Sequence, residues 1–279
     1  MDANKRLLFT LAFSSVFILT TAALRPVQTM QAEYFYLVRY DKKPDCDVVI
    51  AGNSRADCDV IPEITGPICG KTYLFAVNDV QLTPAFLSKI PEKLNPEGKK
   101  IILFALSPNE FKSAGETKAF SRMHEMTPGR RKVEADVFRR FDAFDTDPAV
   151  NRRDDGYHEL RYPATQRSKD YVLGVYAANK PARQDKIDVF AAEVKKLTAA
   201  GYTVMGCRFP TCPEMVKLED EQWDYDAFRK TTSGAGMIWI DIDGEYETVD
   251  ASHMTPDSAR KFSKALAYKI KEIEDGKAR

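Results

Sequence analysis

The sequence has no excess of either charge, because 41 Lys and Arg residues balance 41 Asp and Glu residues among 279. A nucleic-acid-binding protein needs a basic excess to neutralise phosphates, so this balance argues against a nucleic-acid partner. Histidine is scarce, with three residues, and no Cys/His spacing matches a zinc site. The sequence therefore indicates neither a metal nor a cofactor. It also lacks internal repeats and low-complexity tracts, and its length suits one large α/β domain or two small ones.

Cysteine is also infrequent, and its odd count of five leaves at least one thiol free. In an oxidising compartment Cys58 could pair with Cys69, and Cys207 with Cys212. The alternative is that these residues act as small buried hydrophobic side chains. The sequence leaves both open, because pairing depends on geometry that spacing does not fix.

One long uncharged segment is present, over residues 7–24 at the N-terminus, with basic residues before it. Its length lies at the lower edge of a membrane-spanning helix. The basic flank predicts a cytoplasmic N-terminus with the remainder exported. We therefore expect a signal anchor over residues 1–25 that attaches the protein to a membrane, with its catalytic domain outside the cytoplasm, periplasmic or extracellular. A cleaved signal peptide and a soluble core helix are the alternatives.

Segments typical of buried strands alternate with helical segments through the rest of the chain. The expected strands cover residues 47–51, 72–77, 100–106, 202–209 and 237–242, and the expected helices 84–94, 186–200 and 256–273. This alternation predicts an α/β fold, a three-layer α/β/α sandwich around a parallel sheet. Residues 26–46 would be a connector to a domain over 47–279. Within it, the polar segment at about 112–180 is expected to be an insertion or cap over the active-site end.

Four polar residues follow three of these expected strands. Ser54 comes after the first strand and Asn109 after the third. Asp250 and His253 come after the fifth. Because parallel sheets bind ligands beyond the carboxyl ends of their strands, we expect these residues to meet there. Ser54 would be the nucleophile, His253 its base and Asp250 the carboxylate that orients the base, while Asn109 and the Ser54 N–H would stabilise an oxyanion.

Each of these features has a simpler alternative when taken alone. A Gly-x-Ser is commonly a polar turn that caps a helix, and the Gly-x-Ser-x-Gly elbow is absent because Ala56 takes the place of its last glycine. Asn109 could be a local cap after Pro108. Asp155 and His158 repeat the Asp-x-x-His spacing. We prefer His253, because a well-capped helix follows it, and expect His158 on a surface loop.

Three further residues are candidates for substrate binding. Arg208 lies at the end of the fourth expected strand and could bind an anionic group of the substrate, with a solvated loop as the alternative. Arg55 follows the candidate nucleophile. His158 would contact substrate if it is not simply a surface residue.

Taken together, the segments at 51–55 (AGNSR), 106–109 (LSPN) and 250–253 (DASH) resemble the conserved blocks of the SGNH/GDSL hydrolase superfamily. The resemblance implies a flavodoxin-like parallel sheet and an esterase or acyltransferase that works through an acyl-enzyme. It also implies a backbone donor from the second block, where a glycine is usual. This sequence has FAVNDV at 75–80 instead, so Asn78 or Asp79 would supply that N–H, with the Asp79 carboxylate pointing away from the oxyanion.

Within that superfamily, the motifs around Ser54 and Asn109 resemble a membrane-anchored branch that includes the D-alanyl transfer protein DltD and alginate O-acetylation proteins. This likeness implies an acylated carbohydrate or other ester as substrate, a cell-envelope polymer as its source, and a membrane-bound O-acyltransferase as partner. Two non-catalytic alternatives stay open. One is a glycan-binding protein that keeps the fold, and the other is a scaffold for the acyltransferase.

Overall fold

The computed structural model describes residues 36–77, 80–113, 118–141 and 150–276. The chain divides into two compact units. The first comprises residues 1–41 and 126–146, and the second comprises residues 42–125 and 147–279. The first unit contains helix α6 (Pro128–Phe141). Within that unit the guanidinium of Arg131 donates to both carboxylate oxygens of Asp41. The second unit carries the sheet and all the candidate site residues that the structure describes.

The predicted anchor over residues 1–25 lies outside the described residues. Within the described ranges, no helix is long and apolar enough to cross a membrane.

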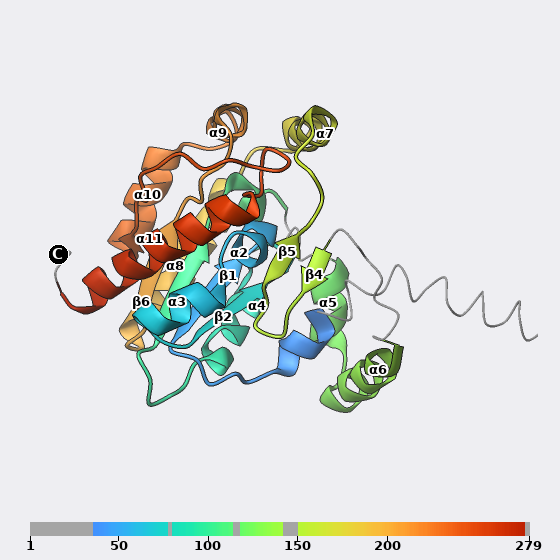
Figure 1. Ribbon diagram of the computed structural model, residues 1–279. Coiled ribbons are helices and arrows are strands. Elements are labelled where there is room, and N and C mark those ends of the chain that lie inside the picture. The colour runs from blue at the N-terminus through green and yellow to red at the C-terminus, as the bar shows by residue number, and fades with distance from the viewer. Residues whose placement is uncertain (1–35, 78–79, 114–117, 142–149, 277–279) are drawn as a thin grey trace, which may run out of the picture. The chain divides into compact units, whose positions relative to one another are not determined.

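A five-stranded parallel sheet forms the centre of the second unit (Figure 1). Its members are β1 (Val48–Gly52), β2 (Thr72–Ala76), β3 (Ile101–Ala105), β6 (Thr203–Cys207) and β7 (Ile238–Trp239). They lie in the order β2-β1-β3-β6-β7, so counted along the chain the order is 2-1-3-4-5, that of flavodoxin-like doubly wound sheets. Gly52 pairs with both Ala76 and Ala105, so three neighbouring strands end at the same level.

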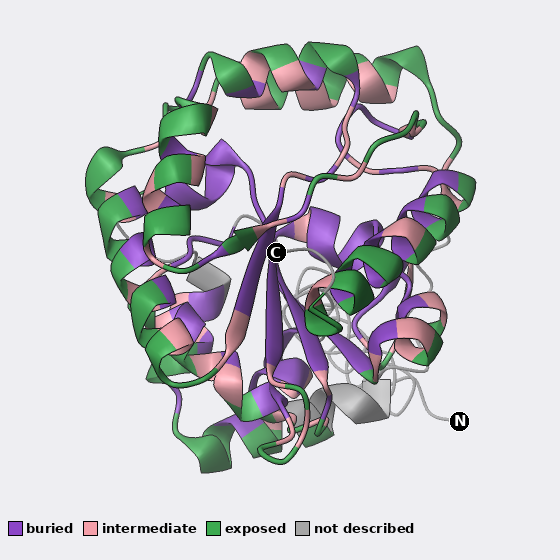
Figure 2. Cartoon of the chain, turned by 90° about the vertical axis from the view of Figure 1, so that its left-hand side faces the viewer, coloured by how far each residue is buried: buried purple, intermediate pink, exposed green. Residues whose placement is uncertain are grey.

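Alternate residues of the central strands pack against different helical layers. On one face, Ile50 and Leu103 join a core with Phe262 and Leu266 of helix α11 (Pro256–Glu274). On the other, Phe104 packs edge-on against Phe190 of helix α8 (Gln184–Ala199). Because both faces are covered, every residue of β1 and β3 is buried, and Figure 2 shows buried strands at the centre of the sheet. The structure is thus an α/β fold with a parallel sheet flanked by helices.

The helices of this unit connect the strands and cover both faces. They are α2 (Ser54–Cys58), α3 (Pro62–Cys69), α4 (Pro84–Lys89), α5 (Lys118–Glu125), α7 (Gln166–Ala177), α8 (Gln184–Ala199), α9 (Pro213–Asp220), α10 (Tyr225–Gly234) and α11 (Pro256–Glu274), with 3₁₀ turns η1 (Pro91–Lys93) and η2 (Pro108–Phe111). The helix expected over 84–94 is divided into α4 and η1, because Pro91 cannot donate the backbone hydrogen bond that would continue α4.

The polar segment at 112–180 contains regular structure of its own. In addition to α5 and α7, it contains an antiparallel pair of short strands, β4 (Val150–Arg152) and β5 (His158–Leu160). β5 lies against α2, the short helix that follows β1 (Figure 1). Leu160 of β5 packs with Cys58 of α2 and with Val249 near the C-terminus. The segment therefore contributes buried side chains that pack against α2, the helix that begins with Ser54.

Candidate active site

Ser54 is the first residue of α2 and stands two residues beyond the end of β1. Gly52 has φ +152°, and a Cβ there would lie 2.7 Å from the carbonyl oxygen of Ala105, so the turn after β1 requires glycine. Asn53 caps α2, and its Oδ1 accepts the Arg55 N–H at 2.9 Å. These two residues turn the chain sharply and place Ser54 at the N-terminus of the helix.

The side chains of Ser54, His253 and Asp250 form one continuous hydrogen-bonded chain. His253 Nε2 lies 2.7 Å from Ser54 Oγ, and His253 Nδ1 lies 2.8 Å from Asp250 Oδ2. The other carboxylate oxygen, Oδ1, accepts the backbone N–H groups of Ser252 at 3.1 Å and His253 at 2.9 Å. The hydroxyl of Tyr162 also donates to Oδ2, at 2.8 Å. The Asp250 carboxylate therefore accepts four hydrogen bonds.

Electrostatics favour a charged carboxylate next to a basic imidazole. Burial alone would lower the pKa of His253, but the hydrogen bond and charge of Asp250 outweigh it and raise that pKa above its ordinary value. Burial acts in the opposite sense on Asp250, yet the hydrogen bonds from His253 and Tyr162 hold its pKa well below the usual range. Asp250 is thus ionised at neutral pH and available to stabilise an imidazolium.

Asn109 lies in η2, directly beyond β3, the strand that pairs with β1. Its Oδ1 accepts a hydrogen bond from Asn179 Nδ2 at 2.8 Å, and its backbone carbonyl accepts one from Gln81 Nε2 at 2.8 Å. The first contact orients the side-chain amide and occupies its carbonyl oxygen, and the second holds the backbone of the turn. Asn78 and Asp79, the other candidate oxyanion residues, lie outside the described residues.

Glu110 follows Asn109 and is buried beneath this turn. One of its carboxylate oxygens accepts the Ser107 N–H at 2.9 Å and the Ser107 hydroxyl at 2.7 Å, and the other accepts from Asn53 Nδ2. Burial raises the pKa of Glu110 to about 7, against the opposing effect of the Ser107 hydrogen bonds. Glu110 therefore connects the turn that contains Asn109 to Asn53, the N-cap residue directly before Ser54.

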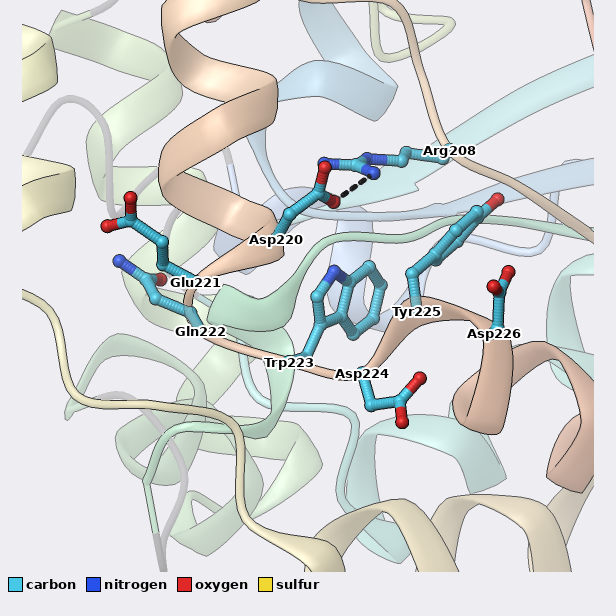
Figure 3. Close-up of a pocket in the computed structure, with 8 residues that line it drawn as sticks. All are labelled: Arg208, Asp220, Glu221, Gln222, Trp223, Asp224, Tyr225 and Asp226. Atoms are coloured by element: carbon cyan, nitrogen blue, oxygen red, sulfur yellow. Dashed lines mark hydrogen bonds and ion pairs between the residues drawn. The ribbon is translucent and has the colours of Figure 1, made fainter.

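Arg55 and Arg208 converge on one buried carboxylate. Arg55 Nη2 lies 2.6 Å from Glu219 Oε1, and Arg208 Nε lies 3.1 Å from Glu219 Oε2. Arg208 Nη1 also lies 2.7 Å from Asp220 Oδ1. Arg208 and Asp220 both line a pocket, and the dashed line in Figure 3 marks this ion pair. Arg55 and Arg208 were both predicted to bind substrate, but the structure gives each of them protein partners. Binding of substrate by either residue stays a prediction.

His158 lies in a different environment from the one expected. It was predicted on a surface loop, which is wrong: the side chain is buried in β5, with Nδ1 3.3 Å from Asp57 Oδ2 of α2. Cys58 Sγ in turn lies 3.4 Å from Asp57 Oδ1. Potential metal-ligating atoms of the three residues lie within 4.8 Å of one another. This group was not predictable from the sequence, because His158 is about 100 residues from the other two along the chain.

All five cysteines are buried free thiols. This agrees with the second of the two alternatives left open by the sequence, small buried hydrophobic side chains. Cys207, for example, belongs to β6 and packs into the sheet core. Burial raises the pKa of Cys58 and of Cys207 above the ordinary thiol range.

Sequence reasoning missed two residues beside the candidate triad, one that contacts Asp250 and one that contacts the residue after His253. Tyr162 donates to Asp250, and Asp59 Oδ1 accepts the Met254 N–H at 2.7 Å, next to His253. Asp59 is fully buried. Its position one residue after α2 gave a weak signal, because a charged residue among apolar ones needs a partner when buried. Tyr162 gave none.

No protein-family model and no curated protein matches the chain. Among solved structures, one match is a protein from Streptococcus pneumonia assigned provisionally as a platelet activating factor. It is 12% identical, with a TM-score of 0.44, over 92% of this chain and 98% of that one. A second is a carbohydrate esterase whose active site is described as having divergent catalytic and non-catalytic binding functions. It is 13% identical, with a TM-score of 0.39, over 83% of this chain and 66% of that one.

Proposed function

We propose that this protein is a serine esterase or O-acyltransferase/deacylase of the SGNH type, acting on ester-linked acyl groups through an acyl-enzyme. One observation carries the proposal, the unbroken contact from Ser54 through His253 to Asp250, with distances of 2.7 and 2.8 Å. Nucleophile, base and orienting carboxylate in this arrangement are the working parts of acyl transfer. The order of the strands in the sheet supports the same assignment.

In the first half-reaction, His253 Nε2 takes the proton of the Ser54 hydroxyl as Oγ attacks the ester carbonyl carbon. This step requires the neutral imidazole in the tautomer that carries its proton on Nδ1. In that form Nδ1–H donates to Asp250 and Nε2 accepts from Ser54. The carbonyl electron pair moves onto oxygen, where the Ser54 N–H and Asn109 would stabilise it. The tetrahedral intermediate collapses to an acyl-serine, and His253 returns the proton to the departing alkoxide.

In the second half-reaction, His253 removes a proton from water or from a sugar hydroxyl as its oxygen attacks the acyl carbon. The bond from that carbon to Ser54 Oγ then breaks, and His253 returns the proton to Oγ. Water as acceptor makes the protein a hydrolase, and a hydroxyl makes it a transferase. As part of the same proposal, the substrate is an acylated carbohydrate of the cell envelope. Residues 1–25 would anchor the protein in a membrane, with its catalytic domain outside the cytoplasm. A membrane-bound O-acyltransferase would be its partner.

The test is labelling of the purified protein with a fluorophosphonate, which reacts with activated serines. We expect wild type to be labelled, and Ser54→Ala and His253→Ala to remain unlabelled while folded. Ser233→Ala is a matched control, since that serine is exposed on α10. Folded wild type that resists the probe would overturn the proposal and favour a non-catalytic glycan-binding protein or scaffold. Incubating a labelled acyl donor with and without a sugar acceptor then distinguishes hydrolase from transferase.

A further inference from the structure

Asp250 has a hydrogen-bond partner that a Ser-His-Asp arrangement does not require. The hydroxyl of Tyr162 donates to Asp250 Oδ2 at 2.8 Å, and His253 Nδ1 lies 2.8 Å from the same oxygen. The phenol is the donor, because burial first, and then the charge of Asp250, raise the pKa of Tyr162 and keep it protonated. One carboxylate oxygen is therefore shared between the base and a tyrosine.

Tyr162 belongs to the segment that the sequence indicated only as a polar insertion. It stands two residues beyond β5, and its ring packs against the cluster of Cys58, Leu160 and Val249. The contact of His158 with Asp57 adds a second link between β5 and α2. The β4–β5 segment, residues 150–162, is thus attached to the helix that begins with Ser54, and its Tyr162 donates to the Asp250 carboxylate.

We propose that Tyr162 is a positioning residue for Asp250, and that the β4–β5 segment completes the active site by supplying it. This inference rests on the proposed function for its catalytic consequence. The hydrogen bond holds the carboxylate in the plane that faces His253 Nδ1. It also takes up part of the carboxylate charge, which moderates the basicity of His253. Tyr162 itself touches neither Ser54 nor any reacting atom.

The test compares Tyr162→Phe with wild type and with Tyr171→Phe. Phenylalanine keeps the ring that packs against Leu160 and removes only the hydroxyl. Tyr171 is a matched control, because its side chain is 72% exposed on α7. We expect Tyr162→Phe to lower kcat/KM for an aryl ester about tenfold, mostly through kcat, as the loss of a hydrogen bond to a charged group predicts. Tyr171→Phe should match wild type.

A second readout does not depend on catalysis. NMR titration of the His253 imidazole, assigned with His253→Ala, should show a higher pKa in Tyr162→Phe, because Asp250 then directs its full charge at His253. A purely structural role would leave that pKa unchanged. Wild-type kcat/KM together with an unshifted His253 titration in Tyr162→Phe would overturn the inference.

The two readouts separate this inference from the proposed function. If wild type resists the fluorophosphonate but the His253 pKa still rises in Tyr162→Phe, the proposed function fails and the positioning role stands. If wild type is labelled at Ser54 while Tyr162→Phe changes neither rate nor titration, the proposed function stands and the positioning role fails.

Discussion

Arg55 Nε donates to Ser252 Oγ across 3.1 Å, which joins the residue after Ser54 to the residue before His253. Both side chains are buried. The Ser252 N–H in turn donates to Asp250. The backbone on both sides of the Ser54–His253 contact is therefore held by one guanidinium, whose own charge is balanced by Glu219 at 2.6 Å.

This arrangement predicts a large loss of stability on changing Glu219→Gln. The substitution keeps the shape of the side chain but leaves the buried guanidinium of Arg55 without a counter-charge. Removing one member of a buried pair costs about 3–5 kcal/mol of unfolding free energy. Urea denaturation measures it. Glu214→Gln is the control, since Glu214 pairs with Lys169 at the surface and should change stability by less than about 1 kcal/mol. Equal effects of the two substitutions would contradict the prediction.

The order and spacing of the main elements followed from periodicity. Five expected strands and the helix after Thr255 appear within a few residues of their predicted bounds, because apolar runs and the cap Thr255-Pro256 are local signals. The fifth strand is shorter than expected, since its ladder contacts cover only Ile238–Trp239. β7 is the edge strand of the sheet and pairs with β6 alone among the described strands. Its length is therefore set by how many residues pair with β6 and not by the length of the apolar run.

The surroundings of the site were not predictable in the same way. Tyr162, His158 and Glu219 reach their partners across separations of about 90, 100 and 160 residues. Such contacts depend on how the layers pack, and no local pattern encodes that. The polarity of the 112–180 segment also misled, because a few buried side chains in β5 matter more than its average composition.

The pKa of His253 predicts the acid side of the pH–rate profile. In the proposed mechanism only neutral imidazole can accept the Ser54 proton, so activity would be lost as pH falls through this pKa. Asp250 raises it, which places the acid limb of kcat/KM above the ordinary histidine value of about 6.5. Asp250→Asn should move the limb to lower pH and reduce kcat by about 10⁴-fold, because the charge and the tautomer are both lost. A limb that stays in place in Asp250→Asn would count against the assignment.

Asp59 predicts a pH dependence of stability. Burial raises its pKa to about 7, against opposing effects of the His253 charge and the Met254 N–H. Between pH 4 and 7 the folded state then keeps a proton that the unfolded chain has lost, so the unfolding free energy falls as pH rises through this window. Asp59→Asn keeps an acceptor for the Met254 N–H and removes the titration. We expect it to flatten that fall by roughly 3 kcal/mol.

Urea denaturation of wild type and Asp59→Asn at several pH values between 4 and 8 measures this slope. The slope is more informative than stability at a single pH, because the amide also changes the neutral contacts of Asp59 equally at all pH values. Asp188→Asn, on the exposed face of α8, is the control and should keep the wild-type slope. Parallel curves for Asp59→Asn and wild type would refute the assignment of the titration to Asp59.

Asn109 predicts a graded loss of activity along its hydrogen-bonded pair with Asn179. Asn179 Nδ2 donates to the carbonyl oxygen of the Asn109 amide at 2.8 Å. In the proposed mechanism the Asn109 Nδ2–H₂ group then donates to the developing oxyanion. Asn109→Ala removes that donor and should lower kcat by about 10²- to 10³-fold, with KM little changed. Asn179→Ala leaves the donor in place but frees the amide to rotate, so its loss of kcat should be smaller.

The two substitutions together identify the role of the pair. If Asn179 acts only by holding Asn109, the double variant should be as slow as Asn109→Ala alone, since there is no donor left to orient. Losses that multiply would mean that Asn179 acts by a separate route. Because the Asn109 backbone carbonyl still accepts from Gln81 in every variant, the turn after β3 should keep its shape. A change in kcat can then be assigned to the amide and not to the loop, provided that the unfolding free energies of the variants agree.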